Sequence, residues 1–138
     1  MNLGVTQETA WLWLRASLTA ANVTGGRVYR ETAPTDAAFP LTLVTLIPFG
    51  SELGNGAAHM YDQFVARVQT VSRDAPAGST NADRAAVYTA LHDKSGAVVS
   101  TGGAVLSCVK SNDLPARPQR DGMTLYWYPG LEFQLTVQ

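Results

Sequence analysis

Two β-prone runs constrain this chain more than any other feature: LTLVTLI at residues 41–47 and QFVARVQTVS at residues 63–72. Their β-branched and aromatic residues predict two long strands. The glycine-rich segment between them is far too long for a two-residue hairpin turn. We therefore expect a hairpin whose tip is an extended arm at residues 49–60. The apolar side chains that would anchor this arm are Phe49, Leu53 and Met60.

The expected strands differ in whether one face or both faces carry apolar side chains. Residues 131–138 alternate cleanly between apolar and polar side chains, which predicts a half-buried strand with one wet face. Residues 41–47 carry apolar side chains on both faces. The second face therefore needs a cover, and the sequence leaves open whether a neighbouring subunit or the arm of the same chain supplies it.

The remaining pattern predicts an α+β fold. Residues from Thr6 onward place apolar side chains on one helical face, and residues 82–92 predict a second helix that Thr80 and Asp83 would cap. Further strands are expected at residues 27–31, 104–111 and 123–138, and a polar loop is expected between the last two. We expect one domain, residues 1–138, in the order α-β-β-β-α-β-β. It would be an antiparallel sheet of about four to five strands with two helices packed on one face.

Composition favours a protein that associates with others. Hydrophobic residues make up 46% of the chain, and charged residues make up 15%, below the ~25% that is typical of soluble domains. A chain with so little charge is expected to place some apolar surface against a partner. The net charge of −1 gives no general attraction to nucleic acid. No segment predicts a signal peptide or a membrane span, so we expect a soluble intracellular product without a membrane partner.

No residue pattern predicts an enzyme, a metal site or a cofactor. Cys108 stands at an alternating strand position, where a buried inert thiol is expected. His92 falls near the end of the second helix, where it would serve a structural role. His59 lies in the arm without an acidic partner at a recognisable spacing. Arg117 and Arg120 form the densest cationic feature, which is either a solvated loop or a weak phosphate contact.

The order of segments resembles a known family. An amphipathic first helix leads into GGRVYRETAPTDAAFPLTLV, a long strand ends near VQTVSRD, and a second helix precedes the closing LEFQLTV. This layout resembles the tail-terminator (tail-completion) proteins of long-tailed bacteriophages and gene-transfer particles. The residues that carry the resemblance are Tyr29, Pro34, Phe39 and Pro40, together with the closing strand. The length and glycine content of residues 49–60 depart from the family pattern.

The resemblance implies a structural virion protein without catalytic residues. Such a protein caps the head-proximal end of the tail tube as a ring of six, ends tube polymerisation and joins the tail to the head. Its partners would be further copies of itself, the tail tube protein and a head-side neck or stopper protein. Genome DNA would pass through the ring without specific binding. The protein would be assembled in the host cytoplasm and located in the virion.

Specific residues and alternatives follow from this hypothesis. The predicted subunit or tube interface consists of Phe49, Leu53, His59, Met60, Tyr61, Arg117 and Arg120. The alternatives are another neck or head-closure component, and a stand-alone α+β module that binds a ligand or nucleic acid. An enzyme would require a strongly shifted pKa at His59 or Cys108 in a cleft.

Overall fold

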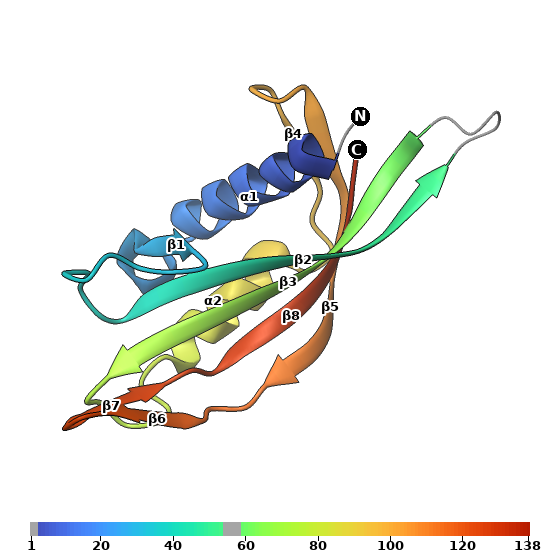
Figure 1. Ribbon diagram of the computed structural model, residues 1–138. Helices are drawn as coiled ribbons and strands as arrows, with labels where there is room; N and C mark the ends of the chain where they lie inside the picture. The colour runs from blue at the N-terminus through green and yellow to red at the C-terminus, as the bar shows by residue number, and fades with distance from the viewer. Residues whose placement is uncertain (1–2, 54–58) are drawn as a thin grey trace.

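A computed structural model of the chain describes residues 3–53 and 59–138 (Figure 1). The helices of this described part are α1 (Leu3–Ala20), the short 3-10 helix η1 (Val23–Gly26) and α2 (Asn81–Leu91). The strands are β1 (Val28–Arg30), β2 (Leu41–Leu53), β3 (His59–Arg73), β4 (Gly96–Val98), β5 (Gly103–Leu114), β6 (Pro118–Asp121), β7 (Thr124–Trp127) and β8 (Gly130–Val137).

The sheet is larger and more mixed than the sequence predicts. Its eight strands run β1-β2-β3-β8-β5-β4, with β7 added to the end of β3 and β6 added to β7. β1 pairs in parallel with β2, whereas the other pairs are antiparallel. The expected antiparallel sheet of four to five strands in the order α-β-β-β-α-β-β is therefore wrong.

The error lies mainly in the C-terminal third of the chain. The single strand expected at residues 123–138 is broken at Pro129 into β7 and β8, which pair with different parts of β3. Part of the expected polar loop forms β6, which pairs with β7 through a two-residue turn at Gly122 and Met123. Gly122 adopts a φ of 61°, the left-handed conformation that such tight turns require. Because all of β6 is exposed, it has no apolar alternation to predict it.

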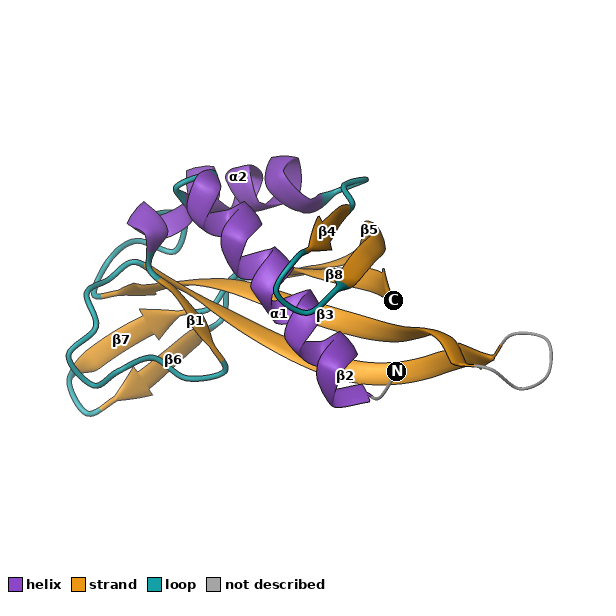
Figure 2. Cartoon of the chain, turned by 90° about the horizontal axis from the view of Figure 1, so that it is seen from above, coloured by secondary structure: helices purple, strands orange, loops and turns teal. Residues whose placement is uncertain are grey.

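The α-helices α1 and α2 lie on the same side of the sheet (Figure 2). The core between these layers comes from alternate positions of the central strands. Its largest buried side chains include Leu14 and Leu18 of α1, Phe64 of β3, and Phe133 and Leu135 of β8. Full burial of side chains of this size stabilises the fold by about 1.5–3 kcal/mol each.

The helix ends are held by tertiary contacts. Thr80 precedes α2 but makes no capping hydrogen bond from its side chain. Its hydroxyl instead donates to the backbone oxygen of Thr70 at 3.3 Å. The Asp83 carboxylate accepts a hydrogen bond from the Thr24 backbone N–H at 2.8 Å. The predicted capping pair is therefore wrong, because both side chains bind other elements.

The β2–β3 hairpin projects beyond the body of the sheet (Figures 1 and 2). β3 pairs with β8 only from Asp62 to Gln69, whereas β2 and β3 remain paired as far as Leu53 and His59. Strand pairing thus continues into both ends of the segment predicted as an arm. The middle of that predicted arm, residues 54–58, lies outside the described residues.

Candidate interaction surfaces

Among the described residues, no group of three or more His, Cys, Asp or Glu side chains is arranged to hold a metal ion. In the same part of the chain, no helix is both long enough and apolar enough to cross a bilayer.

Cys108 and His92 occupy structural positions. Cys108 is fully buried, as the sequence predicts, and burial raises the pKa of its thiol to about 12. His92 stacks on Tyr88 with ring centroids 4.6 Å apart. Its Nδ1 atom accepts a hydrogen bond from the Lys110 backbone N–H at 3.1 Å. The His92 imidazole therefore connects the C-terminal end of α2 to β5.

One end of the molecule, which we call the hairpin end, consists of the projecting parts of β2 and β3. Beyond Val44, no other described strand pairs with the outer edge of β2. Ile47 and Phe49 remain 41% and 50% exposed on this strand. Exposed Pro48 lies between them, and proline within a sheet is confined to edges because it lacks an N–H. This end therefore presents strand backbone together with apolar side chains.

The predicted arm residues fall at this same end. Phe49 is exposed and Tyr61 is partly buried. Leu53 ends β2, and His59 and Met60 begin β3. The backbone pairing thus brings these five positions together, but their contacts with a partner stay a prediction.

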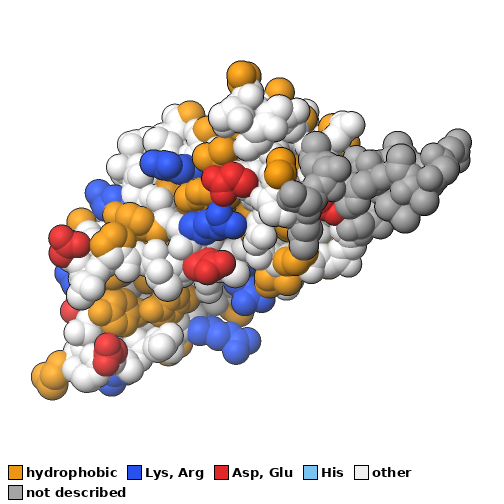
Figure 3. Space-filling model, turned by 45° about the horizontal axis from the view of Figure 1, so that its top comes forward, with side chains coloured by type: hydrophobic (Ala, Val, Ile, Leu, Met, Phe, Trp, Pro, Cys, Tyr) orange, Lys and Arg blue, Asp and Glu red, His pale blue; other side chains and the backbone are white. Residues whose placement is uncertain are grey.

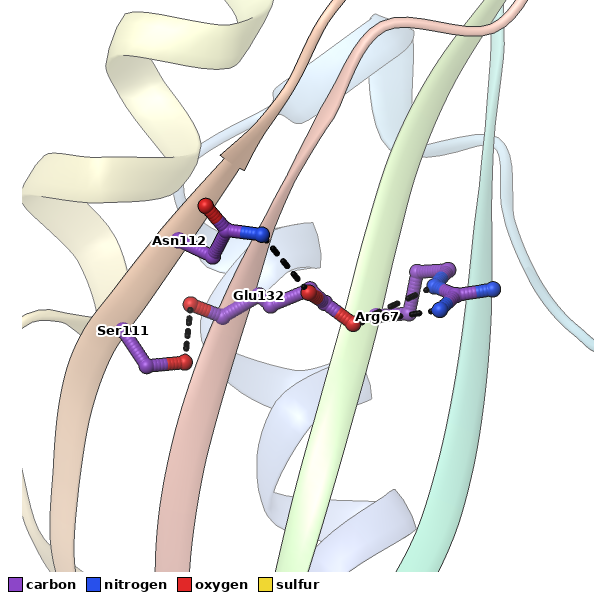
Figure 4. Close-up of polar contacts among 4 residues, drawn as sticks. All are labelled: Arg67, Ser111, Asn112 and Glu132. Atoms are coloured by element: carbon purple, nitrogen blue, oxygen red, sulfur yellow. Dashed lines mark hydrogen bonds and ion pairs between the residues drawn. The ribbon is translucent and has the colours of Figure 1, made fainter.

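A polar network crosses the sheet on the face opposite the core (Figure 4). Glu132 of β8 lies between Arg67 of β3 and Asn112 of β5 in the strand register. Its Oε2 atom accepts hydrogen bonds from Arg67 Nε and Nη2 at 3.4 and 3.2 Å, and its Oε1 atom accepts one from Asn112 Nδ2 at 3.2 Å. The Ser111 hydroxyl donates to the Glu132 backbone oxygen at 3.3 Å. One carboxylate thus links three strands.

Three adjoining hollows lie at the opposite end of the molecule, which we call the grooved end. The first, of about 580 Å³, is lined by Arg67, Gln69, Leu114, Pro115, Arg117, Pro118, Gln119 and Tyr128. The second, of about 540 Å³, shares Gln119 and Tyr128 with the first and adds Phe39, Leu41, Leu43, Val71, Arg73, Arg120 and Tyr126, among others. The third, of about 170 Å³, shares Phe39 and Arg73 with the second and adds Pro40, Ser72, Ala75 and Ser79.

Positive charge and aromatic rings line these hollows. Arg73 lies over the Phe39 ring, with its guanidinium carbon 4.7 Å from the ring centroid. Phe39 also packs against Tyr126 at 5.7 Å. Burial, and then the nearby Tyr126 and Asp121, raise the pKa of the Tyr128 phenol above its ordinary value. In the described part of the chain, neither Arg117 nor Arg120 has a carboxylate within ion-pair distance.

The structure separates the predicted interface residues into two groups. The arm residues lie at the hairpin end, whereas Arg117 and Arg120 line the grooved end (Figure 1). Sequence reasoning gave no site role to Phe39, Ser72 or Arg73. Ser72 and Arg73 are adjacent in β3, and only the fold brings Phe39 against them. On the face seen in Figure 3, basic and acidic side chains are interspersed among apolar ones without an extended area of one sign.

Comparison with known proteins gives a distant structural likeness. No protein-family model matches the chain, and no curated protein matches it. Among solved structures, it is similar to a chain of the "Virion of native gene transfer agent (GTA) particle". The two chains share 17% identity over 96% of each chain, with a TM-score of 0.45. A likeness at this level assigns neither a family nor a function.

Proposed function

We propose that this chain is a non-enzymatic structural protein of a virion tail. In this proposal it caps the head-proximal end of the tail tube as a ring of six, ends tube polymerisation and forms the joint to the head. The observation that carries the proposal is the hairpin end, where the open edge of β2 and the exposed Ile47 and Phe49 project beyond the sheet. The order of segments in the sequence, which resembles tail-terminator proteins, gives the specific role.

The physical basis is strand addition. An open strand edge can pair with the backbone of a second chain, and exposed apolar side chains beside it add burial to that contact. Burying the exposed half of Phe49 would contribute roughly 1 kcal/mol per copy. A ring requires one surface to contact a different surface on the next copy, which an open edge at one end of the molecule permits.

The partners follow from the same role. They are further copies of the chain, the tail tube protein and a head-side neck or stopper protein, all assembled in the host cytoplasm and carried in the virion. Genome DNA passes through the ring without sequence-specific binding. With 10 basic and 11 acidic side chains, the protein has no charge surplus to grip phosphates tightly.

The test is deletion of the gene from the genome that produces the particles, followed by electron microscopy. A tail terminator predicts tubes of uncontrolled length without heads. A head-closure component predicts tails of normal length that stay separate from filled heads. Particles of normal form would contradict any structural role in the tail or neck.

A complementation series sharpens this test. Wild-type protein supplied in trans should restore normal tails, whereas Phe49→Asp should fail because it places a charge in the proposed contact. Val99→Asp is a matched control, since Val99 is an apolar residue that is 95% exposed in the turn between β4 and β5. The proposal requires that this control restores normal tails.

A further inference from the structure

We infer that the grooved end is a docking site for an extended acidic peptide segment of a partner protein. The inference rests on the proposed function only for the identity of the protein that carries this segment. Its chemistry stands on the hollows themselves, which adjoin because neighbouring ones share the lining residues Gln119 and Tyr128, or Phe39 and Arg73.

Charge complementarity identifies the occupant as anionic. Arg67 and Arg117 line the first hollow, and Arg73 and Arg120 line the second. The only carboxylates among the lining residues are Glu31 and Asp121, both in the second hollow. Arg67 already binds Glu132, but Arg117 and Arg120 are exposed and have no ion-pair partner in the described chain. A guanidinium binds carboxylates with its planar set of donors, so both arginines can receive acidic side chains.

The rest of the lining favours a polypeptide. Aromatic rings and apolar side chains line the second hollow together with two arginines, which suits a peptide that carries both apolar and acidic side chains. Duplex DNA fits less well, because strong phosphate binding requires many cations and the chain has a net charge of −1.

Ser72 supplies an independent observation. It lines the third hollow, is only 3% exposed, and its hydroxyl has no hydrogen-bond partner among the described residues. A buried hydroxyl without a partner is costly. The hydroxyl oxygen is itself inaccessible in the isolated chain, so it donates a hydrogen bond to a docked peptide only if the lining of the third hollow moves on binding.

The test uses the full-length protein and fluorescence anisotropy. The probe is a labelled synthetic peptide of alternating glutamate and valine, and its control has lysine in place of glutamate. We expect the acidic peptide to bind in preference to the basic one, with an affinity that falls as salt rises. Equal binding of the two peptides, or no binding of the acidic one, would overturn the inference.

Variants locate the site. The double variant Arg117→Glu, Arg120→Glu should weaken binding of the acidic peptide by about tenfold or more, because it replaces two attractions with repulsions. Arg15→Glu, at an exposed position of α1, is the matched control and should bind as wild type does. If the double variant does not fold, Arg117→Gln with Arg120→Gln should give a loss in the same direction. Unchanged binding in either double variant contradicts the site.

Two further measurements separate competing explanations. Ser72→Ala should weaken peptide binding about threefold while leaving the thermal melt unchanged or raised, because it removes an unsatisfied hydroxyl. A lowered melting temperature with unchanged binding would assign Ser72 a structural role and count against the inference.

Competition with duplex DNA is the second measurement. Displacement of the peptide by duplex DNA, with the same dependence on Arg117 and Arg120, would overturn the inference in favour of nucleic acid. None of these assays requires the virion, so their failure leaves the ring proposal to its own test.

Discussion

At the residue scale, the Glu132 side chain joins β3, β8 and β5. It is 16% exposed and binds groups from both neighbouring strands. By contrast, the pair between Arg30 and Glu8 lies at the surface, with side chains 31% and 47% exposed. The bonds from Arg67 to Glu132 are part-buried and the bond from Asn112 is exposed. Hydrogen bonds to charged groups contribute more than exposed ion pairs, which are worth ~0–1 kcal/mol.

Glu132→Ala is therefore expected to lower the free energy of unfolding by about 1–3 kcal/mol, because Arg67 and Asn112 lose their shared acceptor. Glu8→Ala should change it by less than about 1 kcal/mol. Urea denaturation of both variants measures the difference. Equal effects would mean that the network across β3, β8 and β5 contributes no more than a surface pair.

Cys108 gives a second prediction at this scale. Burial raises the pKa of its thiol from 9.0 to about 12, so the folded protein keeps the thiol protonated while the unfolded chain begins to ionise near 9. The contribution to stability is fully present below pH 9 and is lost as pH rises toward 12, because only the unfolded state releases the proton.

At pH 8, a disulfide reagent is therefore expected to label native Cys108 slowly and the urea-unfolded protein quickly. The double variant Cys108→Ser, Val109→Cys moves the thiol to a neighbouring position that is 43% exposed. This variant should react quickly while folded. Fast labelling of native wild-type protein would contradict the burial of Cys108.

At the scale of elements, Gly130 begins β8 directly after the break at Pro129. A Cβ atom at Gly130 would overlap the Val68 carbonyl oxygen and lie 3.0 Å from the Gln69 Cα atom, both on the paired strand β3. The neighbouring Pro129 carbonyl accepts a hydrogen bond from the Thr70 N–H at 2.9 Å. The chain can thus cross from β7 to β8 only with its backbone close against β3.

Gly130→Ala is expected to lower the free energy of unfolding by about 1–3 kcal/mol, because backbone atoms of β3 must move to admit the methyl group. Gly122→Asn is the matched control. It lies in the tight turn between β6 and β7 with open space around it, and asparagine tolerates its positive φ. A similar loss of stability in both variants would refute the close approach at Gly130.

At the scale of the whole molecule, the two ends are expected to act separately. Ile47→Asp with Phe49→Asp should prevent self-association, measured by light scattering of the concentrated protein or by ring counts on tail tubes. The same variant should bind the acidic peptide normally, because its substitutions lie at the opposite end from the hollows. The double variant Arg117→Glu, Arg120→Glu should lose binding of the acidic peptide and keep self-association. Joint loss of both activities in either variant would indicate a single shared surface.

The sequence by itself determined the features that depend on local periodicity. Side-chain spacing predicted three such features. They are the alternation in residues 131–138, the two long strands β2 and β3, and the burial of Cys108. The ends of the two long strands were not read from this spacing, because Phe49 was expected in the arm and lies within β2.

Only the tertiary structure decided the features that depend on pairing between distant segments. β6 has no apolar pattern, and it exists because its backbone pairs with β7. Phe39, Arg73 and Arg120 are far apart in the chain and share one hollow only because β7 pairs with the end of β3. Side-chain periodicity reports which face of an element is buried, but it carries no information about which strands become neighbours. The grooved end is built from such neighbours, so it could not be found before the fold was known.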